Sequence, residues 1–407
     1  MDQPFLLGVN YWPRKKAMYW WSDFDAGEVR EEFSLIHELG LTLVRIFLLW
    51  DDFQPDPDEV SASSLNSLVT VCDIASSLNL KLNITFFTGH MSGPSWVPRW
   101  MLSGEKPQSI RQVVSAGKIV DSGYLNPYSD GKVLRAEKLQ LQTVVGLLKD
   151  HPAIWCWNLG NEPDIFALPE NEVIGEKWAA DMTELIHSID PVHPVTCGLH
   201  VASLLYNNGL RLDQIFPKTD FAVMHSYPMY MLGLARNPLD TDYVPFTCAL
   251  TAALSGKLVL MEEFGGCTAP PGRESFDWEW IGYGQESKQF MASEEALAEY
   301  YEAVFPKLIE VGAIGALMWC FADYHPNLWD RPPCSESWHE RYFGIIRPDG
   351  SLKPHAQIIR DFAATHPVVK QATKFISLPY TSSEYYDNTV EKLLSLYQQW
   401  NEGIKGN

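Results

Sequence analysis

The sequence lacks the short motifs that mark several enzyme classes. It has no His-Glu-x-x-His and no other spacing typical of zinc ligands, which argues against a metal hydrolase. It has no Gly-x-Ser-x-Gly turn to expose a nucleophilic serine, and no glycine-rich loop to hold a phosphate group. We therefore expect an enzyme, if it is one, that requires neither a metal nor an organic cofactor.

Cysteines are few and do not form a pattern. There are seven, an odd number, and none belongs to a C-x-x-C pair, so the sequence predicts neither a disulfide framework nor a zinc site. Cys156 and Cys320 lie inside apolar runs, where a free thiol acts as a small hydrophobic group. This usage favours a reducing compartment. Because residues 5–12 already read as a strand, leaving no room for a signal peptide, we expect a cytoplasmic protein.

Positive charge is scarce. Lys and Arg total 31 against 51 Asp and Glu, a formal net charge of −20, and no basic stretch interrupts the acidic background. Such a field repels nucleic acids and anionic membranes. No run approaches the roughly 18 apolar residues that a membrane-spanning helix needs. We expect neither partner, and nothing in the sequence indicates an oligomeric state.

Apolar, β-branched runs alternate along the chain with longer amphipathic stretches, which is typical of parallel strands covered by helices. The eight runs are residues 5–12, 41–50, 80–89, 153–160, 193–199, 220–227, 257–265 and 314–321. Eight such units predict a (β/α)8 barrel in a single domain, residues 1–370, with a C-terminal helical extension, 371–407, packed on it. The alternative is an open doubly wound sheet, which the missing phosphate-binding loop disfavours.

Two carboxylates stand where this barrel would place its chemistry. Catalytic groups of such barrels come from the carboxyl ends of the strands. The fourth run delivers Asn161 and Glu162, and the seventh ends in Glu262 and Glu263. A carboxylic acid facing a carboxylate across the barrel mouth suits glycoside hydrolysis, because one protonates the leaving oxygen and the other attacks the anomeric carbon. Arg45 on the second run is placed to lower the pKa of the attacking carboxylate.

Further side chains fit the same chemistry. Tyr227 is placed to orient the attacking carboxylate, Asn161 to bind a sugar hydroxyl, and Trp319 to stack on a sugar ring. The long loops 89–133 and 264–293 predict the walls of a cleft. Each residue alone is common in ordinary structure, and the weight lies in their joint arrangement at the correct strand ends. Aromatic residues that the sequence assigns to the mouth are Tyr11, Trp12, Trp50, Trp96, Trp278 and Trp280.

The chain resembles the retaining (β/α)8 glycosidases, and most closely glycoside hydrolase family 5. The resemblance covers about residues 5–365. It rests on "NEP" (161–163) after the fourth strand, "EFG" (263–265) at the seventh, Arg45, His90, the pair His225 and Tyr227, and Trp319. It implies Glu162 as the acid/base and Glu263 as the nucleophile. It implies substrate contacts by Arg45, His90, Asn161, His225, Tyr227 and Trp319, to which we add Trp50 and Trp96 from the aromatic mouth.

The resemblance favours a β-mannoside as the substrate, cleaved by an exo-β-mannosidase or a β-mannanase-like enzyme. Exo action on short oligosaccharides is favoured because the sequence shows no carbohydrate-binding module, linker or export signal. A β-glucosidase or endoglucanase, a retaining transglycosylase and a non-catalytic sugar-binding barrel remain alternatives. Three finer expectations follow. Glu262 should point outward toward the helices, because neighbouring strand residues face opposite sides. The pKa of Glu162 should be raised so that it holds its proton. The acid limb of the activity should belong to Glu263 and the alkaline limb to Glu162.

Overall fold

The computed structural model describes residues 3–106 and 111–403. Its core is a parallel sheet of eight strands in the order β8-β7-β3-β2-β1-β13-β10-β9. The strands are β1 (Leu6–Asn10), β2 (Leu43–Leu49), β3 (Lys81–Thr88), β7 (Ile154–Asn161), β8 (Val195–Gly198), β9 (Ala222–His225), β10 (Val259–Phe264) and β13 (Gly315–Met318). The two terminal strands meet through a parallel bridge between His200 and His225. The predicted (β/α)8 barrel is confirmed, and each of the eight predicted runs matches one barrel strand, with β7 ending one residue beyond its run.

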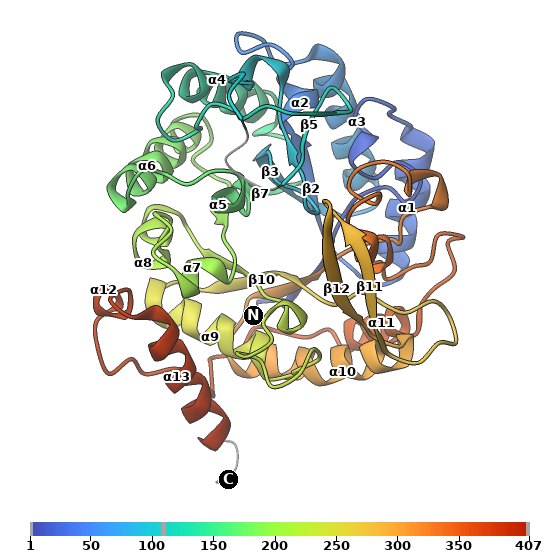
Figure 1. Ribbon diagram of the computed structural model, residues 1–407, viewed down its shortest axis with the longest axis vertical. Coiled ribbons are helices and arrows are strands. Elements are labelled where there is room, and N and C mark those ends of the chain that lie inside the picture. Colours follow the sequence, from blue (N-terminus) through green and yellow to red (C-terminus); the bar gives the residue numbers. More distant parts are fainter. Residues whose placement is uncertain (1–2, 107–110, 404–407) are drawn as a thin grey trace.

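Helices surround the strands (Figure 1). Those that follow successive strands are α1 (Ala26–Glu38), α3 (Ala62–Ser77), α4 (Gly131–Leu148), α6 (Glu172–Ile189), α8 (Leu212–Ile215), α9 (Tyr243–Ser255), α10 (Glu294–Glu310) and α11 (Pro354–Ala364). Short helices α2 (Trp50–Phe53), α5 (Pro163–Phe166) and α7 (Ala202–Leu205) follow β2, β7 and β8 directly. The strands are buried on both faces, which explains why they read as continuous apolar runs.

Helix α9 has no amphipathic pattern in the sequence, because nearly all of its side chains are buried. Its outer side is covered by the end of the chain, which forms α12 (Ser382–Tyr385) and α13 (Thr389–Gly403). Phe246 of α9 packs against Tyr397 and Trp400 of α13, with ring centroids 4.7 and 5.9 Å apart. Figure 1 shows α12 and α13 beside α9. Residues 404–407 of the predicted extension 371–407 lie outside the described part of the chain. The division of the chain into a barrel, 1–370, and this extension stays a prediction.

The loops at the carboxyl ends of the strands carry small elements of their own. The loop after β3 holds β4 (Ser95–Trp96), β5 (Val113–Ser115) and β6 (Lys118–Val120), and the loop after β10 forms the hairpin β11 (Phe276–Gly282) and β12 (Gln285–Met291). The 3-10 helices are η1 (Ala17–Tyr19), η2 (Arg99–Met101), η3 (Phe216–Lys218), η4 (Pro228–Tyr230), η5 (Pro326–Leu328) and η6 (Trp338–Tyr342). Part of the predicted loop 89–133, residues 107–110, lies outside the described residues.

All seven cysteines are buried and unpaired, including Cys156 and Cys320, whose burial their apolar runs predict. Within residues 3–106 and 111–403, none of the helices combines the length and the apolar character that crossing a bilayer requires.

Candidate active site

A cavity of about 440 Å³ opens at the carboxyl ends of the barrel strands. Seven of the predicted site residues line it: His90, Asn161, Glu162, His225, Tyr227, Glu263 and Trp319. They come from the ends of β3, β7, β9, β10 and β13, or from the residues that directly follow. The barrel therefore gathers into one cavity side chains that are up to 229 positions apart in the sequence, from His90 to Trp319.

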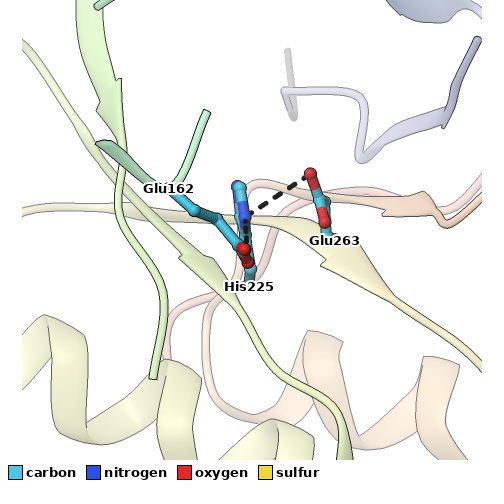
Figure 2. A group of neighbouring side chains, drawn as sticks. All are labelled: Glu162, His225 and Glu263. Carbon is cyan, nitrogen blue, oxygen red and sulfur yellow. Dashed lines mark hydrogen bonds and ion pairs between the residues drawn. The ribbon is translucent and has the colours of Figure 1, made fainter. Parts of the chain in front are cut away.

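The two glutamates predicted to act on the sugar face each other across His225 (Figure 2). Nδ1 of His225 lies 3.2 Å from Oε1 of Glu162 and 3.4 Å from Oε1 of Glu263. One carboxylate oxygen from each glutamate lies within 4.8 Å of the other. The three side chains also offer ligand atoms for a metal ion at this spacing. Their other partners, described next, fit charge and proton chemistry instead.

Glu263 is held on both of its oxygens. Nη1 of Arg45 donates to Oε1 at 2.6 Å, and the hydroxyl of Tyr227 donates to Oε2 at 2.9 Å. Arg45 is fully buried beneath Glu263 and does not line the cavity. Its Nη2 also donates to Oδ1 of Asn161 at 3.0 Å, and Asn161 donates in turn to the backbone carbonyl of His90 at 3.3 Å. Arg45 therefore positions Glu263 and Asn161 together.

The backbone presents Glu162 in an uncommon conformation. Its φ is +44°, in the left-handed region, directly after Gly160 at φ +114° and Asn161. A non-glycine residue in this region stores strain, which is frequent at functional sites. The amide of Glu162 donates to the carbonyl of Gly198 in β8 at 2.9 Å, and Pro163 begins α5 immediately afterwards. The turn thus ends β7 abruptly and aims the carboxylate into the cavity.

The prediction that Glu262 points outward is wrong. The register of β10 against β9 shifts between Met261 and Glu263, so the strand bulges and the alternation of side chains breaks at this point. Glu262 is fully buried inside the barrel. Its Oε1 accepts hydrogen bonds from Asn83 at 2.6 Å and Asn158 at 2.8 Å. Its Oε2 lies 3.0 Å from Nε2 of His225 and 3.4 Å from Nη2 of Arg45.

Glu262 is therefore the carboxylate that supports Arg45 and His225 from below. We expect Glu262→Gln to lower the free energy of unfolding by about 3–5 kcal/mol, since it removes the charge from a buried ion pair and leaves Arg45 less compensated. Urea denaturation measures the loss. The exposed Glu299→Gln on α10 is the matched control and should change stability by no more than about 0.5 kcal/mol. A loss below about 1 kcal/mol for Glu262→Gln would contradict this role.

The pKa values of the two facing glutamates are opposite to those expected. Burial raises the pKa of Glu162, but the charge of His200 and the hydrogen bond from His225 lower it more, so the net pKa falls below its usual value. Burial raises the pKa of Glu263, whereas the positive charges of His225 and Arg45 lower it. The negative charge of Glu162 raises it again, and the net pKa of Glu263 lies above its usual value. The expectation overlooked the histidines, which contact Glu162 only in the folded protein.

His200 is a site residue that the sequence analysis missed. Its Nε2 lies 3.0 Å from the carboxylate of Asp164, which Asn208 also contacts, and its Nδ1 lies 3.7 Å from Oε1 of Glu162. Burial lowers the pKa of His200, but the charges of Asp164 and Glu162 raise it to about 9. His200 follows the fifth strand by two positions, so the strand-end rule applied to that strand would have found it.

Several predicted aromatic residues lie outside the cavity lining. Trp50 and Trp96 are only 1% and 2% exposed, and their indole N–H groups donate to Gln54 and to the carbonyl of Met91. The prediction that these two contact the substrate is therefore corrected: their size and apolar character serve packing beneath the loops. Tyr11 and Trp12 are fully buried as well. Trp278 and Trp280 lie on β11, where they pack against Trp338.

A third loop, after β13, also lines the cavity and carried no motif in the sequence. Ser337, His339, Glu340 and Phe343 reach the cavity from it. The hydroxyl of Tyr283, at the tip of the β11–β12 hairpin, lies 2.9 Å from Oγ of Ser337. Gly93 packs against both, since a Cβ at this glycine would lie 2.4 Å from the Tyr283 hydroxyl and 2.7 Å from the Ser337 hydroxyl. Three loops thus meet in a continuous wall on one side of the cavity.

Comparisons with known proteins agree with this geometry. The family model described as "Glycosyl hydrolases family 2, TIM barrel domain" matches residues 106–231. Mannan endo-1,4-beta-mannosidase A of Hypocrea jecorina is 26% identical over 277 residues, which cover 62% of this chain and 59% of that protein. The probable mannan endo-1,4-beta-mannosidase F of Aspergillus flavus is 27% identical over 150 residues, 34% of this chain and 32% of that protein. The resemblance to (β/α)8 glycoside hydrolases is confirmed.

Solved structures show the same fold. An exo-beta-1,4-mannosidase from Opitutaceae bacterium strain TAV5 superposes with a TM-score of 0.72 at 24% identity, over 89% of this chain and 60% of that one. A GH5_18 protein from Streptomyces cattleya, solved with GlcNAc, gives a TM-score of 0.73 at 19% identity, over 92% and 83%. The chain spans less than two thirds of the length of the curated relatives named above.

Proposed function

We propose that the protein is a retaining β-mannoside hydrolase. The observation that carries the proposal is the spacing of Glu162 and Glu263, whose nearest carboxylate oxygens lie within 4.8 Å. Retaining glycosidases hold their two carboxyl groups about 5–5.5 Å apart, whereas inverting enzymes need about 6.5–9.5 Å to fit a water molecule between sugar and base. The narrow gap leaves room for the sugar carbon alone and favours direct attack.

In the first step, Glu263 attacks the anomeric carbon while Glu162 protonates the departing oxygen, which leaves a glycosyl ester on Glu263. In the second step, Glu162 removes a proton from water, which attacks the same carbon and releases the sugar with its original configuration. Arg45 and Tyr227 keep Glu263 oriented through their bonds to its two oxygens. Asn161 and Trp319 line the cavity beside the reacting carbon, where they bind a hydroxyl and a ring face.

The proton for the leaving group is shared by Glu162 and His200, whose Nδ1 lies 3.7 Å from Oε1 of Glu162. In the free site the pKa of His200 is about 9 and that of Glu162 is lowered, so at neutral pH the proton lies on His200. Two groups coupled this closely titrate as a pair, and the pair keeps its last proton up to the higher pKa. When a substrate binds, this proton passes from His200 to Glu162. Glu162 then donates it to the glycosidic oxygen of the leaving group.

Two observations favour a mannoside and exo action. The curated relatives are named mannan endo-1,4-beta-mannosidases, which supports the sugar and leaves the site of cleavage open. One structural neighbour is named an exo-beta-1,4-mannosidase, which supports exo action. The wall formed by Gly93, Tyr283 and Ser337 closes one side of the cavity, which suits a terminal sugar unit better than the middle of a polymer. A second cavity of about 570 Å³ adjoins the first at Arg111 and Ile165, and offers room for the rest of the oligosaccharide.

The test is hydrolysis of 4-nitrophenyl β-glycosides of mannose, glucose, galactose and xylose, with the anomer of the first product followed by proton NMR. We expect mannoside to be the best substrate and the first product to be the β-anomer. Preference for the glucoside would keep the mechanism and change the sugar. Transfer of the sugar to added mannobiose in place of water would indicate a transglycosylase. A first product in the α-form would overturn the retaining mechanism.

A further inference from the structure

Glu340 is a third glutamate of the cavity that the steps above do not use. It lies in η6 of the loop after β13, is 9% exposed, and lines the same cavity as Glu162 and Glu263. Its Oε2 is buried and makes no hydrogen bond of ordinary geometry with any of the described residues. A buried acceptor without a donor costs roughly 1–3 kcal/mol, and more when charged. Such a group in a cavity wall points to a ligand that supplies the donor.

The surroundings of Glu340 place it beside the sugar platform. Burial raises the pKa of Glu340 most, the charges of Glu263 and Glu162 add to this, and the nearby polar groups of Ser92 and Trp319 oppose it, so that the net pKa is about 7. The Ser92 hydroxyl nevertheless lacks the geometry of a hydrogen bond to Oε2, and both atoms are without a partner among the described residues. His339 lies 3.6 Å from Oε1, but burial lowers the pKa of this histidine to about 4, so it carries no charge at neutral pH. Because Trp319 touches both the cavity and Glu340, a ring stacked on Trp319 would present its edge to this carboxylate.

Contacts of the next two residues hold the backbone around Glu340, so the point from which its side chain enters the cavity is set before a ligand arrives. The next residue, Arg341, donates from Nε and Nη2 to the carbonyl of Cys334 at 3.0 and 2.7 Å. Nζ of the buried Lys353 donates to the carbonyl of Tyr342 at 3.2 Å and pairs with Asp323 at 2.7 Å. A binding residue on a held backbone segment loses less conformational freedom on binding than one on a free loop, which favours specific recognition.

We propose that Glu340 accepts hydrogen bonds from hydroxyl groups of the terminal sugar unit and is a specificity-determining residue of this site. The proposal rests on the proposed function, which places the anomeric carbon of that unit between Glu162 and Glu263. Two neighbouring sugar hydroxyls match the two oxygens of a carboxylate, and they satisfy the acceptor that the protein leaves unpaired. A site built to bind hydroxyls in this manner discriminates strongly against sugars that lack one.

The test is calorimetric binding of β-1,4-mannobiose to Glu263→Ala, a background chosen to bind without turnover, and to the same protein carrying Glu340→Ala, Glu340→Gln or Asp330→Asn. At pH 8.5, where Glu340 with its pKa of about 7 is ionised, we expect Glu340→Ala to weaken binding about 10- to 100-fold, as for loss of hydrogen bonds to a charged group, and Glu340→Gln to weaken it less. Asp330→Asn removes an exposed charge from the same loop and should change the affinity less than twofold. Circular dichroism checks that each variant is folded.

Deoxygenated ligands separate recognition from a structural role. Methyl β-mannosides that lack one hydroxyl, at C2, C3, C4 or C6 in turn, should bind the Glu263→Ala protein less well than the parent sugar. At least one of these losses should vanish when Glu340 is Ala, because the partner of that hydroxyl is already gone. Equal losses in both proteins, an unchanged affinity in Glu340→Ala, or no binding of mannobiose to Glu263→Ala would each overturn the inference. A further outcome separates the two proposals. If binding depends on Glu340 but the wild type hydrolyses none of the four nitrophenyl glycosides, the inference is supported and the proposed function is rejected.

Discussion

Glu263→Ala will hydrolyse 4-nitrophenyl β-mannoside at least about 10,000-fold more slowly than the wild type. The variant lacks the atom that forms the bond to the anomeric carbon, and residues that act as a unit in covalent catalysis show losses of this order. Arg45 keeps its ion pair with Glu262 and its hydrogen bond to Asn161 in this variant. Tyr227 keeps its ring contacts with Tyr230 and Phe343. Initial rates from released nitrophenolate measure the effect. The exposed Glu299→Gln serves as the matched control, with unchanged rates.

Azide makes the same variant more informative. Removal of the carboxylate leaves space beneath the anomeric carbon, into which azide can enter and displace nitrophenolate directly. One displacement inverts the configuration, so the expected product is α-mannosyl azide, identified by NMR. In the wild type, 2-deoxy-2-fluoro-β-mannosyl fluoride should leave its fluorosugar bound to the peptide that contains Glu263. A Glu263→Ala protein that kept more than about a tenth of the activity, or a label on Glu262 instead, would refute the assignment.

Loss of the acid at Glu162 will depend on the leaving group. Glu162→Ala should lower kcat/KM for β-1,4-mannobiose by about 100- to 10,000-fold, since the departing sugar oxygen needs a proton and general acid catalysis contributes on this scale. For 2,4-dinitrophenyl β-mannoside, whose leaving group departs as an anion, bond cleavage should be affected much less. Slow hydrolysis of the glycosyl ester then limits turnover, and a burst of dinitrophenolate should precede a slower steady state. Equal losses for both substrates, without a burst, would exclude Glu162 as the acid.

The pH profile reports where this proton resides. His200, with a pKa of about 9, is protonated at neutral pH and loses its proton as the pH rises through 9. Asp164, Glu162, Glu263 and the neutral His90 surround it. We expect the alkaline limb of kcat/KM near pH 9 in the wild type and at lower pH in His200→Gln, where Glu162 must hold the proton alone. An alkaline limb that stays in place in His200→Gln would show that the pair does not share the proton.

The barrel and the gathering of Glu162, Glu263, Arg45, His225 and Tyr227 could be predicted because each depends on local pattern. A buried parallel strand must be apolar along its length, and the residue at its carboxyl end must leave the core at one face of the barrel. Knowing the strand ends is then enough to place the side chains together. His200 was missed because this rule was not applied to the fifth strand, whose pattern is the weakest of the eight. Trp50 and Trp96 were misplaced because a tryptophan at a strand exit or in a loop packs inward as readily as outward.

The sequence by itself determined the fold class, the strand ends and the pair of carboxylates, all of which follow from hydrophobic periodicity and from polar residues at its breaks. Only the tertiary structure decided the finer chemistry. The bulge in β10 turns Glu262 into the barrel, which depends on how β10 pairs with β9. His200 and His225 lower the pKa of Glu162 because distant strands bring them within a few ångströms. Glu340 reaches the cavity from a loop without a motif. The path of this loop is set by contacts with Lys353 and Tyr283. No short stretch of sequence encodes contacts between segments this far apart.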